Sequence, residues 1–288
     1  MSFISHVLYA VFVRVKYRVQ FVYFSLLPVR SALNHTKRDF SITVSLTSFQ
    51  ARLSTLHLCI KSLMVQSLKP DRIVLYLGTD CDGVTLPAAL LALEKRGLTI
   101  KRGYPNLRPH KKYMFAMKEY PQDYIVTVDD DLLYSRGMIA DLWRTHLQYP
   151  AALPARRVHL MKAAEGRLLA YNDWERECGS VRTPSFALFS TNGAGSLFAP
   201  HCLPPQFLDP ASAAELCLNA DDVWIKFALI KAGIPVVWTG RHRGMPDEIR
   251  IKAERKQALM DSNVTDNAND TYIAGLEKHF GISLADYC

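Results

Sequence analysis

The stretch "YIVTVDDDLLY", residues 124–134, decides the fold of this 288-residue chain. Tyr124 to Val128 form an apolar run rich in β-branched residues, which predicts a buried strand. Three consecutive carboxylates, Asp129, Asp130 and Asp131, follow where that strand should end. Burying three like charges without partners would be costly, so we expect positive charge to lie beside them.

Upstream of this stretch the chain alternates between two kinds of pattern. Strands are predicted at 41–46, 72–77, 98–102 and 123–128, with helices between them at about 56–63, 86–96 and 111–120. Such alternation predicts parallel pairing and a layered α/β sheet. The second half is less regular, with strands predicted near 156–161, 186–190 and 234–238 and helices near 220–232 and 271–280.

Three loops should meet at the carboxyl ends of these strands, where open α/β sheets bind ligands. They are residues 47–52, 78–83 and 129–131. Asp129 and Asp131 are two apart in an extended segment and therefore point the same way. Their hard oxygens suit Mg²⁺ or Mn²⁺, which commonly bridges to phosphate. A solvated acidic turn that caps the next helix is the alternative.

A second pair of carboxylates opens the segment "NADDVWIKFALIKAG", residues 219–233, whose pattern predicts a helix. Asp221 and Asp222 fall in its first turn. One interpretation is a capping box, with Asn219 as the N-cap and Asp222 three residues later. The other is a general base held at the edge of a cleft. The residues alone leave both interpretations open.

Composition excludes some classes of protein. The net charge is +8, but residues 1–40 account for +5 of it, so the body is nearly balanced and offers no broad basic face for nucleic acid. The six cysteines form no C-x-x-C pair. They indicate reduced thiols in a cytoplasmic protein. Nothing in the composition determines an oligomeric state.

The N-terminal segment "FISHVLYAVFVRVKYRVQFVYFSLLP", residues 3–28, is apolar but contains Arg14, Lys16 and Arg18. Its uninterrupted apolar runs fall short of the roughly 18 residues of a membrane-spanning helix. Basic groups among aromatic and aliphatic side chains suit an anionic membrane surface. Packing on the domain or on another subunit is the alternative. Apolar and polar residues alternate at 13–21, as in a strand, so the secondary structure is also open.

Four stretches together resemble a known family. They are "VSLTSFQARL" (44–53), "HKKYMFAMKEYPQDYIVTVDDDLLY" (110–134), "STNGAGSLFAP" (190–200) and "ADDVWIKFALIKAGIPV" (220–236). Their order and spacing are similar to those of metal-dependent, nucleotide-sugar glycosyltransferases of the GT-A fold. The resemblance is strongest to bacterial family-2-like enzymes that build capsule, O-antigen and other surface polysaccharides. It implies a GT-A-like, Rossmann-like, mostly parallel sheet flanked by helices.

The resemblance spans residues 42–240, and with the patterns of the two ends of the chain it predicts a domain organisation. A basic amphipathic arm, residues 1–39, would precede a single glycosyltransferase domain, residues 40–288. Within that domain, residues 40–131 would bind the nucleotide and residues 132–245 would hold the acceptor and the catalytic base. Residues 246–288 would form a C-terminal helical tail.

Roles for the donor site follow from the same resemblance. Its nucleotide-binding residues would be Thr47, Ser48, Arg52, Lys111 and Asp129. Asp131 would ligate the Mn²⁺ or Mg²⁺ on the diphosphate, and Asp129 would hold the ribose or a metal-bound water. His242, which follows the strand at 234–238, is a candidate third metal ligand or phosphate contact. An ordinary surface histidine in the basic run "RHRG" is the alternative.

For the sugars, the resemblance points to a small-residue loop and an acidic helix start. The loop beside the donor sugar would be Asn192, Gly193, Ala194 and Gly195. Asp222 would deprotonate the acceptor hydroxyl, as in inverting members, and Asp221 stands where many relatives carry Glu. Trp224 is a candidate to stack on the acceptor sugar, with a place in the buried core as the alternative.

The predicted reaction moves a sugar from a nucleotide-diphospho-sugar, expected to be a UDP-sugar, to a hydroxyl of a saccharide or lipid-linked saccharide, with inversion. The departing diphosphate needs a cation, and the hydroxyl needs a base. A sugar-phosphate nucleotidyltransferase would carry a glycine-rich loop after the first strand, but "TSFQAR" has no glycine. A non-enzymatic lipid- or nucleic-acid-binding protein would leave both acidic clusters unexplained. We expect a cytoplasmic protein, peripheral on the inner face of the plasma membrane if the arm binds lipid.

Overall fold

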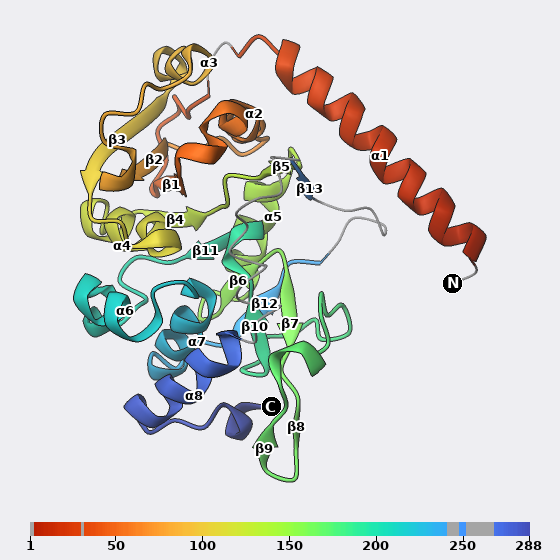
Figure 1. Ribbon diagram of the computed structural model, residues 1–288, viewed down its shortest axis with the longest axis vertical. Helices are drawn as coiled ribbons and strands as arrows, with labels where there is room; N and C mark the ends of the chain where they lie inside the picture. The colour runs from red at the N-terminus through yellow and green to blue at the C-terminus, as the bar shows by residue number, and fades with distance from the viewer. Residues whose placement is uncertain (1–2, 30–31, 241–247, 252–267) are drawn as a thin grey trace.

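A seven-stranded sheet forms the centre of the computed structural model, which describes residues 3–29, 32–240, 248–251 and 268–288 (Figure 1). The strand order is β12-β6-β11-β4-β1-β2-β3. The strands are β1 (Ile42–Ser48), β2 (Arg72–Gly78), β3 (Leu98–Tyr104), β4 (Tyr124–Thr127), β6 (Leu153–Ala155), β11 (Ser196–Phe198) and β12 (Val236–Trp238). Three two-stranded pairs lie outside it: β5 (Leu132–Tyr134) with β13 (Glu248–Arg250), β7 (Val158–Leu160) with β10 (Leu188–Ser190), and β8 (Ala163–Ala164) with β9 (Arg167–Leu168).

The described α-helices are α1 (Phe3–Leu26), α2 (Leu53–Met64), α3 (Ala88–Leu91), α4 (Lys111–Glu119), α5 (Met138–Gln148), α6 (Pro210–Cys217), α7 (Asp221–Lys231) and α8 (Ala268–Phe280). Strand pairing is parallel for β1 with β2 and β4, for β2 with β3 and for β6 with β12. Strand β11 runs antiparallel between β4 and β6. The prediction of a mostly parallel α/β sheet flanked by helices is therefore confirmed.

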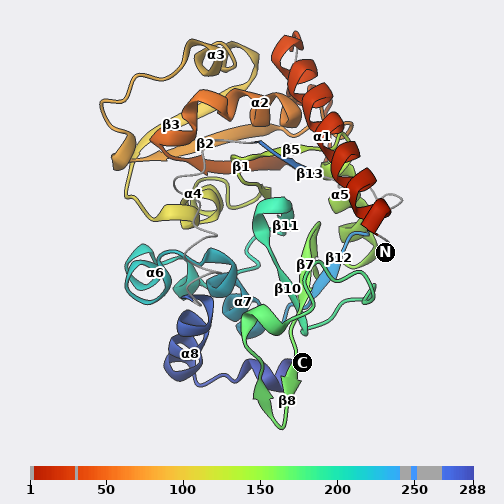
Figure 2. The same ribbon diagram turned by 45° about the vertical axis from the view of Figure 1, so that its right-hand side comes forward.

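Helices cover both faces of the sheet because its strands are apolar on both sides. In β2, Ile73 and Leu75 belong to the core layer that α2 and α5 complete, whereas Val74 and Tyr76 belong to the layer of α4, α7 and α8. Successive side chains of a strand point to opposite faces, so one continuous apolar run supplies both layers. Figure 2 shows α6, α7 and α8 gathered on one side of the molecule, away from α2.

One predicted helix is shorter than expected. Residues 86–96 form only α3 and a 3-10 turn, Glu94–Arg96, before Gly97 ends the segment with a φ of +111°. Between Ala88 and Arg96, Leu90 and Leu93 are the buried side chains. Two apolar contacts give too little packing to hold a longer helix, since helices depend on a buried face for stability.

The N-terminal segment is the helix α1, so the strand-like alternation at 13–21 does not determine its structure. In both views α1 lies outside the layered body, with its C-terminal end near α2 (Figures 1 and 2). Phe24 is buried there, and Lys61 of α2 donates a hydrogen bond to the carbonyl of Ser25 at 2.9 Å. Across the described residues, no helix combines the length and the apolar character needed to cross a membrane.

Candidate active site

The carboxylate of Asp129 lies just past β4, at the edge of the sheet where ligands are expected. Its backbone N–H lies 3.0 Å from the carbonyl of Gly193 and 2.8 Å from the Tyr134 hydroxyl, to which it donates hydrogen bonds. Lys112 donates to Asp129 Oδ1 at 2.9 Å. The Asp129 side chain is 38% exposed, against 6% for Asp130 and 10% for Asp131. Asp129 is therefore the carboxylate of this cluster that a ligand can reach most easily.

Asp130 and Asp131 pair with arginines and are largely shielded from solvent. Asp130 accepts hydrogen bonds from the Ser48 hydroxyl at 2.6 Å and from Arg52. Asp131 Oδ2 lies 3.3 Å from Arg52 and 3.3 Å from Arg250. Burial raises the pKa of Asp130 to about 6, with Asp131 adding to the effect and Arg52 opposing it. The positive charge expected beside the three acids is thus present in the protein itself.

Arg250 reaches Asp131 because a distant part of the chain pairs with the segment after the acids. Strand β13 runs antiparallel to β5, with Arg250 opposite Leu132. The backbone N–H of Ile251 donates to the carbonyl of Asp131 at 2.6 Å. The acidic cluster is therefore closed by residues that lie over a hundred positions later in the sequence.

Lys112 connects the two acidic pairs that the sequence singles out. Its Nζ lies 2.9 Å from Asp129 Oδ1 and 3.0 Å from Asp221 Oδ2, and its side chain is 3% exposed. Burial alone would lower the pKa of Lys112, but Asp129 and Asp221 raise it well above its ordinary value. The ammonium group is therefore charged and holds β4 and α7 at a set separation.

Asp222 does not cap its own helix. The N-cap of α7 is Ala220, and it makes no side-chain hydrogen bond to the helix. Instead, Asp222 Oδ1 accepts from the backbone N–H of Asn192 at 2.8 Å and from the Asn192 side-chain amide at 3.0 Å. Burial, followed by the charge of Asp221, raises the pKa of Asp222 to about 7. A carboxylate with this pKa accepts protons near neutral pH, as a general base must.

The loop around Gly193 is a second connection between the two acidic pairs, because Asn192 contacts Asp222 and Gly193 lies against Asp129. A β-carbon on Gly193 would lie 1.7 Å from Asp129 Oδ2, a distance that no side chain can occupy. Gly195 has a φ of +115°, which glycine adopts readily. Tyr134 donates a hydrogen bond to the carbonyl of Gly193, so the loop is held against the end of β4. Of the four predicted loop residues, Asn192 contacts Asp222 and Gly193 lies against Asp129, whereas Gly195 lies beside Met138 and Arg156.

Three other predicted residues form hydrogen bonds with partners outside the two acidic pairs. Thr47 uses its hydroxyl to donate to the carbonyl of Tyr76 at 2.8 Å, within the sheet edge. Lys111 is buried beside the end of β2 and donates to Asn106 at 2.8 Å. Trp224 was a candidate for sugar stacking, but it is 1% exposed in the core and donates to the carbonyl of Phe207, so no sugar can reach it. His242 lies outside the described residues.

Four residues of the site were not predicted: Asp130, Lys112, Arg157 and Arg250. Arg157 donates to the Thr191 hydroxyl at 2.6 Å and, after Lys112, helps to lower the pKa of Asp129 against the effect of burial. The sequence does signal a cation in "HKKY", but consecutive helical residues point about 100° apart. Only the helix's orientation on the sheet directs Lys112 to Asp129 at the end of β4 and Lys111 to the end of β2.

The acidic cluster can supply only some of the ligands that a divalent cation needs. Within the described residues, no group of three or more His, Cys, Asp or Glu side chains is arranged to hold a metal. Asp129 is accessible, whereas Asp131 is paired with two arginines. Mg²⁺ commonly binds through one or two carboxylates and completes its shell with substrate phosphates and water. The site suits a cation that arrives with a phosphorylated ligand better than a permanently bound ion.

The chain was compared with curated proteins, solved structures and protein families. No curated protein matches the chain. The solved structures that match include a mannosyltransferase from Pyrobaculum calidifontis described in complex with GDP-Man and Mn²⁺, and a 4-diphosphocytidyl-2C-methyl-D-erythritol synthase. The first is 11% identical over 94% of this chain and 72% of its own, with a TM-score of 0.48. The second is 12% identical over 83% of this chain and 99% of its own, with a TM-score of 0.44.

The family model for "Glycosyl transferase family 2" matches residues 43–198. The match begins in β1, runs through the three acids after β4 and ends in β11, so it includes Lys112, Asp129 and the glycine loop. It covers more than half of the chain. The chain therefore belongs to glycosyl transferase family 2.

Proposed function

We propose that this glycosyltransferase is metal-dependent and transfers a sugar, with inversion, from a nucleoside-diphospho-sugar to a hydroxyl of a saccharide or lipid-linked saccharide. The observation that carries the proposal is the arrangement around Lys112. An accessible carboxylate, Asp129, lies on one side of this lysine, and Asp222, with a pKa of about 7, belongs to the acidic pair on the other. One acidic group suits a cation on the donor, and the other suits a proton from the acceptor.

In the transfer, Asp222 takes the proton of the acceptor hydroxyl while that oxygen forms its bond to the anomeric carbon of the donor. The bond between the anomeric carbon and the diphosphate breaks, and its electron pair leaves with the diphosphate. The hydrogen bonds from Asn192 hold the Asp222 carboxylate in one orientation and leave its second oxygen for the hydroxyl. Attack from the face opposite the leaving group would invert the anomeric centre.

Charge on the leaving diphosphate needs compensation. A cation bound by Asp129 and Asp131 would supply Lewis-acid stabilisation of that charge. Arg52 already contacts Asp130 and Asp131, so it lies where phosphate oxygens would approach such a cation. Arginine binds phosphate through two parallel donors, which suits this position. Ser48 and Arg52, predicted to hold the nucleotide, would then act partly by holding the acids in place.

The proposed donor and pathway are based on the resemblance of the four sequence motifs. We propose a UDP-sugar donor, surface-polysaccharide synthesis as the pathway and the cytoplasm as the location. The loop after β1 contains no glycine, which is the feature that disfavours a nucleotidyltransferase.

The test is a screen of UDP- and GDP-sugars for release of the nucleoside diphosphate with Mn²⁺, Mg²⁺ or EDTA. We expect turnover with one donor, lost in EDTA and reduced at least about 100-fold by Asp131→Ala. Asp286→Ala, an exposed acid near the C-terminus, is the matched control and should be unaffected. Mn²⁺ binding in the presence of the nucleoside diphosphate, measured by calorimetry, should fail in the same variant. Turnover that survives both EDTA and Asp131→Ala would refute the metal-dependent mechanism.

A further inference from the structure

The helix α1 leaves a continuous apolar face uncovered. Phe12, Val15, Val19, Val22 and Leu26 are 40%, 54%, 62%, 55% and 77% exposed. Their spacing of three and four residues places them on one side of the helix, within about 40° of a common line. We call these five residues the α1 stripe. Large contiguous apolar surfaces of this kind mark interaction sites on soluble proteins.

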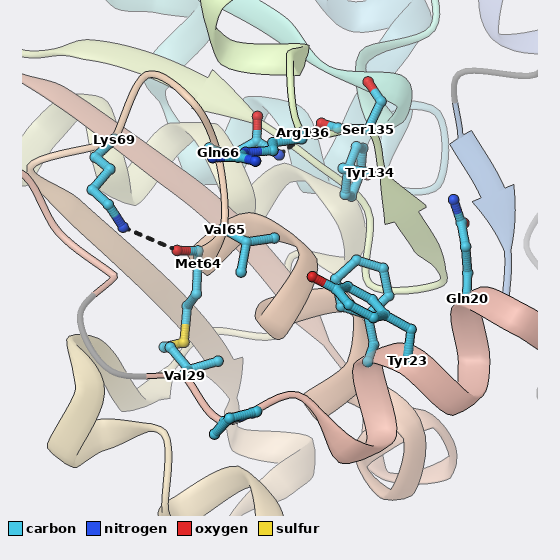
Figure 3. Close-up of a pocket in the computed structure, with 12 residues that line it drawn as sticks. Gln20, Tyr23, Val29, Met64, Val65, Gln66, Lys69, Tyr134, Ser135 and Arg136 are labelled. Atoms are coloured by element: carbon cyan, nitrogen blue, oxygen red, sulfur yellow. Dashed lines mark hydrogen bonds between the residues drawn. The ribbon is translucent and has the colours of Figure 1, made fainter.

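The side of α1 that carries Phe24 packs on the body of the protein, although Val11, Phe21 and Tyr23 are also 50%, 37% and 53% exposed. Phe24, about 160° from the centre of the stripe, is 6% exposed. Gln20, Tyr23 and Phe24 line a cavity of about 540 Å³ against the end of α2 and the segment after β5. Figure 3 shows Gln20 and Tyr23 rising from α1 on the side where Val65 and Tyr134 lie. The stripe therefore remains bare after α1 has packed on its own domain.

Charge around the stripe decides what kind of partner fits. Residues 1–38 contain no Asp or Glu, and α1 carries Arg14, Lys16 and Arg18. Lys16 and Arg18 lie about 80° from the centre of the stripe, one on each side. An apolar face bordered by basic side chains is the arrangement of helices that lie in the surface of an anionic bilayer. Basic side chains there reach the phosphates while the apolar face enters the acyl region.

A second copy of the chain fits less well. The three-and-four spacing is also that of a coiled-coil seam. If two α1 helices met along the stripe, every charged side chain at its margins would be basic, because the helix has no acid to pair with them. Like charges at those positions oppose association.

We infer that the α1 stripe docks the protein on an anionic lipid bilayer, with α1 lying in the plane of the surface. No described helix is able to span the membrane, so attachment would be peripheral and reversible. This inference does not depend on the proposed reaction, since its test measures binding alone.

The experiment is sedimentation of the full chain with vesicles of phosphatidylcholine, or of phosphatidylcholine mixed with phosphatidylglycerol. We expect binding only to the anionic vesicles. Val15→Asp/Val19→Asp should weaken it at least about tenfold, because charges would enter the acyl region. Lys16→Ser/Arg18→Ser should weaken it roughly 30-fold, since each basic residue near an anionic surface contributes about fivefold.

The matched control is Leu147→Asp, which places the same charge at an exposed apolar residue of α5 (65% exposed). Its binding should equal that of the wild type, and circular dichroism should show every variant folded. Wild-type binding by the stripe variant would overturn the inference. A second result would also overturn the inference. If the wild type did not bind anionic vesicles but formed a dimer, and Val15→Asp/Val19→Asp dissociated that dimer, the stripe would be a contact with a second copy of the chain.

Discussion

The acids after β4 and the acids that open α7 share one lysine, yet the pKa of Asp129 is lowered and the pKa of Asp222 is raised. Lys112 lowers the pKa of Asp129 although burial opposes it, so Asp129 is an anion at neutral pH. Burial, followed by the charge of Asp221, raises the pKa of Asp222 to about 7, although Lys112 and the hydrogen bond from the Asn192 backbone N–H oppose the rise. The comparison teaches that burial and neighbouring charges, and not the residue type, set the protonation of a carboxylate.

The largest expected effect comes from removing the proton acceptor. Asp222→Asn should lower kcat about 100- to 10,000-fold, because general bases contribute rate factors of that size. In the wild type, kcat/KM should rise with pH through about 7 as Asp222 ionises, and the rise should vanish in the variant. Steady-state kinetics between acid and alkaline pH measure both effects.

The free energy of unfolding of Asp222→Asn shows whether a lower rate comes from the missing base or from misfolding. The folded-state pKa of Asp222 lies above its ordinary 3.8, so ionisation of the group opposes folding. Its contribution is complete below pH 3.8 and is lost as pH rises through about 7. Asp222→Asn should therefore be at least as stable as the wild type at pH 8. Asp209→Asn, which replaces an exposed N-cap of α6 by another good N-cap, is the kinetic control. A rate for Asp222→Asn within threefold of that control would contradict the base assignment.

Of the substitutions proposed, the loss of Lys112, which contacts both acidic pairs, should lower the free energy of unfolding most. Lys112→Met leaves Asp129 and Asp221 without their cation and should cost about 3 kcal/mol of unfolding free energy, since removing one partner of a buried pair is strongly destabilising. The pKa of Asp129 is below 3.8 in the folded protein, so the stabilisation is present above that pH and is lost as pH falls through the lowered folded value. Urea unfolding at neutral and acid pH should show the deficit shrinking in acid.

Lys118→Met serves as the control, because Lys118 is exposed on the same helix. It should change stability by less than about 0.5 kcal/mol. An equal effect of the two substitutions would mean that Lys112 does not join the acidic pairs.

The smallest expected effect concerns the loop between the pairs. Gly193→Ala places a methyl group 1.7 Å from Asp129 Oδ2, so the carboxylate or the loop must move, at a cost of about 1–3 kcal/mol. Mn²⁺ affinity should fall with it, which calorimetry can measure. Gly275→Ala is the matched substitution, because its β-carbon meets no atom within 4 Å inside α8. That change should stabilise the protein by roughly 0.5–1 kcal/mol. Unchanged Mn²⁺ affinity in Gly193→Ala would show that the close contact is not needed for the cation.

Much of the sheet could be predicted because strand and helix periodicity is local. The runs at 41–46, 72–77 and 123–128 correspond to β1, β2 and β4, and the helix predicted at 220–232 corresponds to α7. Prediction was weaker where burial decides the outcome. The segment 86–96 buries few side chains and forms only a short helix, and α1 alternates like a strand but forms a helix. Trp224 is buried because α7 turns that side chain toward Phe207 and α8, and the direction of a helix face is not local.

The sequence by itself determined that acids stand at the end of a buried strand and at the start of a helix, because strand ends and helix starts follow from neighbouring residues. Only the tertiary structure decided which groups meet those acids. The antiparallel placement of β11 brings Gly193 against Asp129, the pairing of β13 with β5 brings Arg250 to Asp131, and the orientation of α4 selects Lys112. Protonation depends on such contacts, because electrostatic energy depends on distance and burial, and these are set by the folded chain.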